Sequence, residues 1–256
     1  MKRGFTLVEL LVVLAILGIL IALAVPVIGK VLTQGQATAS ANNLKQLVTA
    51  NHNYAVDHGF YAPGSDRGNN KRWHGARSPG GAFDPTQGYL ADYLGQSRRV
   101  TMCPVFAAME KAQDTFEEGT GGYGYNAAYI GGTPEWAYDA EGNQVSARAG
   151  TLLRVSDTIM FASTAYARPD GVQEYPYAEP PFWDFGFGPS GFRPSPTIHF
   201  RFNGRAAIAW ADGHVTFETK QDRPPGTNPH GGDADKQNLG WIGPDENNGF
   251  WNPHRP

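Results

Sequence analysis

Glu9 is a single carboxylate at the edge of a long apolar segment. The run from Leu10 to Ile28 contains no charged residue. As a helix it would be about 28 Å long, close to the thickness of the hydrocarbon core of a bilayer. A carboxylate carried to mid-membrane costs on the order of 2–4 kcal/mol. We therefore expect Glu9 to have a partner.

The sequence Gly-Phe-Thr-Leu-Val-Glu at residues 4–9, joined to this apolar run, resembles the N-terminus of type IV prepilins and type II secretion pseudopilins. The resemblance implies that a prepilin peptidase cuts between Gly4 and Phe5 and that the new Phe5 amine is then N-methylated. It also implies that Glu9, one helical turn further on, pairs with its own terminus or with that of a neighbouring subunit. Such a pair satisfies two charges in a layer of low dielectric constant.

Two simpler interpretations of the segment fit less well. A secretory signal peptide ends in a small-residue cleavage site, whereas this run ends in Ala-Val-Pro-Val-Ile-Gly-Lys at residues 24–30. A plain membrane anchor needs neither the glycine nor the glutamate. Because Lys2 and Arg3 precede the run, the positive-inside rule leaves the N-terminus in the cytoplasm and sends the remainder across the membrane.

Two other groups of residues have the types that bind metals. His199, Asp212 and His214 could ligate zinc, but their spacing matches no established pattern, and we expect surface or hydrogen-bonding histidines instead. Type II major pseudopilins bind calcium through a late loop, and oxygen ligands could come from Asp233 to Asp235 or from residues 245–248. No ordered ligand repeat is present there. We therefore predict no metal and no cofactor, and keep calcium as the one alternative.

The sequence contains no nucleophile elbow, P-loop, His-Glu-x-x-His or Cys/His pattern, so we do not expect an enzyme. The net charge is −3, and the 21 lysines and arginines are scattered. No nucleic-acid groove is predicted. Glycine (32 residues) and proline (19 residues) are abundant, which favours a loop-rich domain with short strands.

The elements that must position these residues begin with one long helix. Leu44, Leu47, Val48 and Ala55 continue a helical period beyond the apolar run, and the glycine and proline of residues 57–64 end it. The prediction is a helix from residue 5 to about residue 56, kinked at Pro26 because proline removes a backbone hydrogen bond. Its second half would lay an apolar stripe on a sheet.

Strand signals lie later in the chain. The segment 158–163 is typical of a buried strand, and the runs 206–210 and 215–217 flank Asp212-Gly213, a strong hairpin signal. The proline-rich segment 168–196 is expected to be an ordered insertion or a flap. The tail from residue 222 is expected to be an extended arm, packed through Trp241, Phe250 and Trp251.

The segments 42–47 and 52–54 and the ending at residues 201–215 resemble pilin-like proteins that carry the prepilin-associated H-X9-DG domain, including the DUF1559 group. Phe202 stands where the histidine of that motif would be, and the nearest histidine is His199. The Asp212-Gly213 turn remains, which favours a structural role for it: glycine permits a positive φ and aspartate caps the turn.

The aromatic residues and the single cysteine leave two alternatives each. Six tryptophans could fill a small core, or some could form a recognition surface with residues 175–177 and 180–183; burial of Trp183 would favour packing. Cys103 would lie in an oxidising compartment without a partner, and we expect it to be buried.

We therefore predict an α+β, pilin-like fold, with a long N-terminal transmembrane and spine helix on a small antiparallel sheet. The expected organisation is a leader (1–4), a transmembrane and assembly helix (5–29), its amphipathic continuation (30–57), a globular domain (58–221) and a C-terminal arm (222–256).

The predicted function is a structural subunit of a type IV pilus or of a type II secretion pseudopilus. Its expected partners are prepilin peptidase, other pilin or pseudopilin subunits, the inner-membrane assembly platform and membrane lipid. We expect a single-pass protein of the bacterial inner membrane, its C-terminal domain in the periplasm or on a surface filament. The alternative is a membrane-tethered binding or adhesion module that uses the prepilin route for export.

Overall fold

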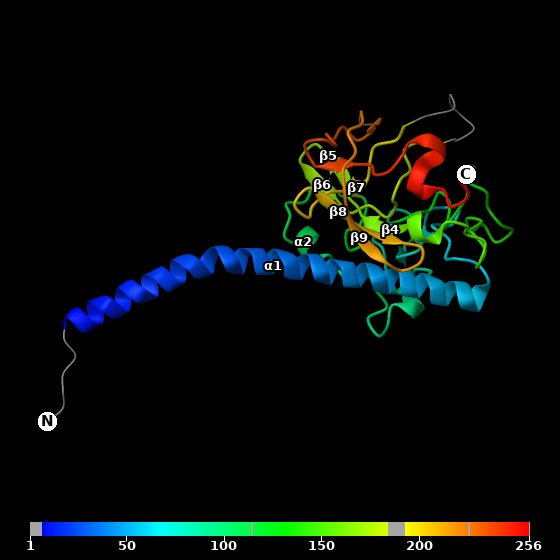
Figure 1. The fold of residues 1–256 in the computed structure, drawn as a ribbon. Coiled ribbons are helices and arrows are strands. Elements are labelled where there is room, and N and C mark those ends of the chain that lie inside the picture. The colour runs from blue at the N-terminus through cyan, green and yellow to red at the C-terminus, as the bar shows by residue number, and fades with distance from the viewer. Residues whose placement is uncertain (1–6, 114, 184–192, 225, 256) are drawn as a thin grey trace.

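The computed structural model describes residues 7–113, 115–183, 193–224 and 226–255, and for residues 23–30 the backbone alone. Its dominant element is α1 (Leu7–His58), a single helix of 52 residues and therefore about 78 Å long. The long helix expected from the sequence is confirmed. Figure 1 shows it as a bent rod whose first half extends away from the globular part.

Two expectations concern the first half of α1, namely a membrane span and a kink at Pro26, and neither is confirmed. Within the part of the chain that the structure describes, no helix is both long and apolar enough to cross a membrane. The span expected over residues 5–29 is therefore not confirmed; residues 5 and 6 and the side chains of residues 23–30 lie outside the description. The helical backbone is continuous through residue 26, and a kink at Pro26 itself stays a prediction.

The globular part is α+β and built on a four-stranded antiparallel sheet in the order β3-β4-β8-β9. These strands are β3 (Tyr123–Tyr125), β4 (Ile159–Ser163), β8 (Arg205–Trp210) and β9 (Val215–Thr219). Three two-stranded sheets accompany it: β1 (Lys71–Arg72) with β2 (Gly75–Ala76), β5 (Tyr166–Arg168) with β6 (Gly171–Gln173), and β7 (Ile198–His199) with β10 (Leu239–Gly240). The short helices are η1 (Pro85–Gln87), η2 (Ala91–Tyr93), α2 (Pro104–Ala107), η3 (Val155–Asp157) and η4 (Glu246–Trp251).

Both faces of the central sheet are covered, and β8 shows why. Its residues alternate between two apolar clusters, as the period of two in a strand requires. Ala207 and Ala209 belong to the cluster that includes α1, and their small side chains let the helix approach the sheet closely. Ile208 and Trp210 belong to the opposite cluster, which the C-terminal segment supplies through Trp241 and Trp251. The packing expected for the C-terminal tail is thus present.

The second half of α1 is held to the sheet by polar contacts as well as apolar ones. The Ser40 hydroxyl lies 2.8 Å from the Tyr123 hydroxyl and donates to the Cys103 sulfur. Further along, the amide of Asn51 donates to the Tyr125 hydroxyl at 3.0 Å, and its carbonyl oxygen accepts from the backbone N–H of Ala62 at 2.9 Å. These pairs fix the rotation of α1 on β3, because each is buried and has a defined geometry.

Replacing Asn51 tests this anchoring. Asn51→Ala leaves the Ala62 N–H and one side of the Tyr125 hydroxyl without partners in a buried site. We expect the free energy of unfolding to fall by about 2–3 kcal/mol, measured by urea titration of the chain in detergent micelles. The control is Thr49→Ala, an exposed position on the same helix, expected to change the free energy by less than about 0.5 kcal/mol. Equal effects of the two substitutions would contradict the anchoring role.

Candidate functional site

The N-terminal motif lies only partly within the described chain. Gly4 and Phe5 lie outside the described residues. Glu9 lies in the first turn of α1, where a carboxylate interacts favourably with the helix dipole. Around it the apolar side chains from Leu7 to Ile21 are between 46% and 75% exposed. An apolar surface of this extent is typical of a segment that other molecules cover.

The Asp212-Gly213 turn connects β8 to β9, which pair in antiparallel register from Ala209↔Val215 outward. Gly213 has a φ of +94°, a conformation that glycine adopts without the penalty of a Cβ. The Asp212 carboxylate accepts from the backbone N–H of His214 at 3.1 Å and lies 2.6 Å from its ring Nδ1. The turn is therefore closed locally by its own side chains.

The residues considered as metal ligands have other surroundings. His199 is buried in β7, not at the surface, and burial, helped by the charge of Arg201, holds the pKa of its imidazole well below the usual range. Asp212 and His214 are exposed in the hairpin turn. In the described part of the chain, no three histidine, cysteine or acidic side chains are grouped as a metal site would require.

The two acidic stretches considered for calcium are engaged within the chain. The Asp233 carboxylate accepts from the backbone N–H groups of Asp235 and Lys236. Asp245 forms ion pairs with Arg193 at 2.8 Å and Arg223 at 2.9 Å. Their oxygens thus serve local turns and ion pairs.

Cys103 and most of the tryptophans are buried, as expected if they pack in the core. Cys103 is fully buried, as expected. Trp183 is 5% exposed, which favours packing over an exposed recognition surface. Of the six tryptophans, Trp136 is the partly exposed one, and its ring lies 5.4 Å from that of Trp183.

These two tryptophans belong to a cavity of about 350 Å³. Aromatic side chains from four separate stretches of the sequence line much of it, namely Phe116, Trp136, Tyr166, Tyr175, Tyr177 and Trp183. Arg72, Glu117 and Glu179 bring charges to the same wall, and all three are buried. Volume and lining are both typical of a small-molecule site.

The segment 175–179 builds one wall because it is joined to β3 by an isolated parallel bridge between Tyr125 and Tyr177. The Tyr125 N–H donates to the Pro176 carbonyl, and the Ala178 N–H donates to the Tyr125 carbonyl, both at 2.9 Å. With this alternation, Ala178 packs in the core, and Tyr175, Tyr177 and Glu179 line the cavity. The alternation Tyr-Pro-Tyr-Ala-Glu is visible in the sequence. Which of its side chains line the cavity is determined by the contact with β3.

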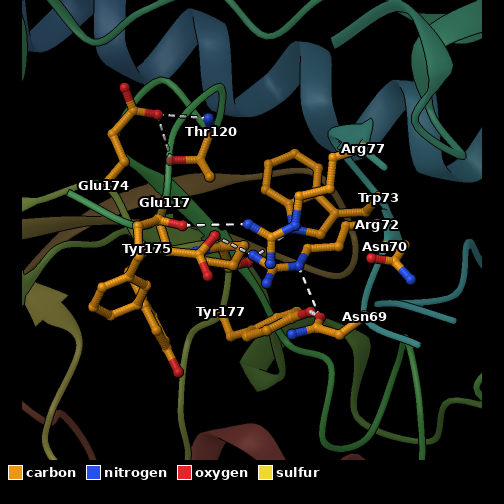
Figure 2. Close-up of polar contacts among 12 residues, drawn as sticks. Asn69, Asn70, Arg72, Trp73, Arg77, Glu117, Thr120, Glu174, Tyr175 and Tyr177 are labelled. Carbon is orange, nitrogen blue, oxygen red and sulfur yellow. Dashed lines mark hydrogen bonds and ion pairs between the residues drawn. The ribbon is translucent and has the colours of Figure 1, made fainter. Parts of the chain in front are cut away.

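Arg72 is held in the cavity wall by polar and aromatic contacts (Figure 2). Its guanidinium forms a short ion pair with Glu117, and its Nε donates to the Asn69 side chain at 2.8 Å. The Tyr177 ring lies 5.7 Å from the guanidinium carbon. The Glu117 segment is positioned in turn by Glu174, whose carboxylate accepts from the N–H groups of Thr120 and Gly121.

Glu179 has a different environment, since its hydrogen-bonding partners are neutral. The Tyr175 hydroxyl donates to Oε1 at 2.9 Å and the Trp183 indole N–H donates to Oε2 at 2.6 Å. Burial raises the pKa of the Glu179 carboxyl to about 7, although both hydrogen bonds act to lower it. This residue, like Arg72 and Glu117, was missed by sequence reasoning, because no spacing along the chain brings the three together.

Comparison with known proteins identifies one region. A family model described as the prokaryotic N-terminal methylation motif matches residues 1–25. The match confirms the first resemblance and supports a type IV prepilin-like protein; the resemblance to H-X9-DG proteins is not confirmed. No curated protein and no solved structure matches the chain.

The conformational role of the hairpin turn can be tested with two glycines. A Cβ at Gly213 would meet no atom within 4 Å, so Gly213→Ala adds only the cost of the positive φ, about 1 kcal/mol. The control is Gly35→Ala, which also meets no atom but lies within α1; there alanine should stabilise by about 0.5–1 kcal/mol. Shifts of the same sign in urea unfolding would refute the assignment.

Proposed function

We propose that this prepilin-like chain is a structural subunit that is processed by prepilin peptidase and assembled into a type IV pilus or a type II secretion pseudopilus. The observation that carries the proposal is the combination of the N-terminal methylation motif with an uncovered apolar helix half from Leu7 to Ile21. The motif supports a structural, prepilin-like protein. Packing of these helix halves against one another would remove their apolar surface from water.

Glu9 has the central role in this assembly. After cleavage behind Gly4, the Phe5 amine is a cation one helical turn from the Glu9 carboxylate. Within a filament of packed helices, the amine of one subunit pairs with Glu9 of its neighbour and sets the axial register. Support comes from the position of Glu9 in the first turn of α1, beside exposed apolar side chains.

Before assembly we place the N-terminal segment in the bacterial inner membrane, with Lys2 and Arg3 in the cytoplasm and the globular part in the periplasm. The charge asymmetry around the apolar run supports this orientation. Membrane lipid and the inner-membrane assembly platform are then the first partners, and other pilin or pseudopilin subunits follow.

A second candidate function is a membrane-tethered binding module that uses the prepilin route for export. The cavity lined by aromatic side chains favours it, because its volume and lining are typical of a small-molecule site. Isolation of surface filaments separates the two: a structural subunit is recovered in them, and a tethered module stays with the membrane fraction.

Processing is tested by the mass of the mature N-terminus. We expect the purified chain to begin at Phe5 with one methyl group on its α-amine, seen by mass spectrometry of the N-terminal peptide. In a strain without prepilin peptidase, the chain should retain Met1 to Gly4. A mature chain that begins after residue 24, as a signal peptidase would leave it, would contradict the proposal.

Assembly is tested by Glu9→Ala. The variant should be inserted and cleaved normally, because neither step needs the carboxylate, but should be lost from sheared filaments by tenfold or more. The matched control is Glu118→Ala, which removes an exposed carboxylate of the globular part and should leave incorporation unchanged. Normal incorporation of Glu9→Ala would show that the pairing role is wrong.

A further inference from the structure

Glu179 lies in the aromatic cavity, and no basic side chain of the described lining pairs with its carboxylate. Arg72 is the buried cation of the lining, and it is paired with Glu117. The remaining basic lining residue, His230, is exposed and packs on Phe116 with ring centroids 4.7 Å apart. The Glu179 carboxylate accepts hydrogen bonds from the Tyr175 hydroxyl and the Trp183 indole N–H, both neutral donors. A positive ligand would therefore complement the site.

The rings around Glu179 suit such a ligand. Tyr175 and Trp183 each donate a hydrogen bond to the Glu179 carboxylate, so both rings lie beside it. The ring centroids of Tyr166 and Tyr175 are 5.0 Å apart, and those of Trp136 and Trp183 are 5.4 Å apart. Faces of aromatic rings attract cations, and cages of such rings recognise ammonium groups. Each Glu179 oxygen accepts one of these hydrogen bonds and retains further acceptor capacity.

We propose that this cavity binds an organic ammonium ion, a primary or methylated amine on an aliphatic stem, with Glu179 as its counter-ion and the surrounding rings as its cage. The inference is independent of the proposed role in assembly. Saccharides also stack on aromatic rings, but a neutral sugar would leave the Glu179 charge uncompensated, so the charge of the site favours the cation.

The inference predicts a pH dependence. A cation binds the ionised Glu179, and the pKa of the free carboxyl is about 7. Affinity should thus rise as pH increases through 7, and be about tenfold weaker at pH 6 than at pH 8. The groups facing Glu179 are Tyr166, Tyr175, Tyr177 and Trp183, with the Arg72–Glu117 pair and His230 also in the lining. His230→Gln is the control for the other basic lining residue, and it should retain the dependence.

The experiment uses the full chain in a polyoxyethylene detergent, which carries neither amine nor sugar. Choline chloride is the probe, and 3,3-dimethylbutan-1-ol is its uncharged isostere; methyl glucoside represents saccharides. Isothermal titration calorimetry and tryptophan fluorescence report binding. We expect choline to bind at pH 8 at least tenfold more tightly than the isostere, and methyl glucoside not to bind.

Two variants locate the site. Glu179→Gln keeps the shape and removes the charge, and should weaken choline binding tenfold or more and abolish its pH dependence. Trp136→Ala changes the partly exposed ring, should fold, and should weaken binding severalfold. If circular dichroism shows that Glu179→Gln does not fold, the proposal is tested by choline binding to Trp136→Ala, by the pH profile and by the uncharged isostere. Unchanged binding by both variants, equal binding of the isostere, preference for methyl glucoside, or no binding of choline each overturns the proposal.

Discussion

The structure depends on the burial of one long helix that has two unlike halves. From Ser40 onward, α1 is covered by the sheet, with Leu44, Leu47 and Val48 almost inaccessible to water. From Leu7 to Ile21, its apolar side chains are exposed. Burial of apolar surface is the main favourable term in both folding and association. The second half of α1 therefore stabilises the domain, and the exposed first half favours contact with other molecules. The globular part is thus fixed to the second half of α1, and the first half presents an apolar surface.

Polar residues as well as apolar packing fix the second half of α1 to the globular part. Asn51 joins the helix to β3 and to the backbone at Ala62, and Ser40 joins it to Tyr123 beside the buried Cys103. On the other face of the sheet, Trp241 and Trp251 of the C-terminal segment close the second apolar cluster. Tyr166 of β5 lines the aromatic cavity, and Figure 1 shows β5 across the globular part from α1. The exposed apolar half of α1 and the aromatic cavity are thus separate surfaces of the chain.

What the sequence could predict differs between these regions for physical reasons. The helix and the β8–β9 hairpin depend on local signals, namely helical periodicity at Leu44, Leu47 and Val48 and the Asp212-Gly213 turn, and both are visible in a short window. The cavity depends on contacts between distant segments: Arg72 pairs with Glu117, and the Tyr125–Tyr177 bridge holds the segment of Glu179 against β3. The aromatic residues near 175–183 were noticed as a recognition loop, but their burial and their shared carboxylate follow from tertiary structure alone.

The covering of the first half of α1 by other subunits is tested most directly by photocrosslinking in living cells. A photoreactive amino acid at position 14, where Leu14 is 56% exposed, reports what touches the helix. Assembly through α1 predicts a ladder of adducts at multiples of the subunit mass that disappears in cells without prepilin peptidase. Adducts with lipid alone, identical with and without the peptidase, would contradict it.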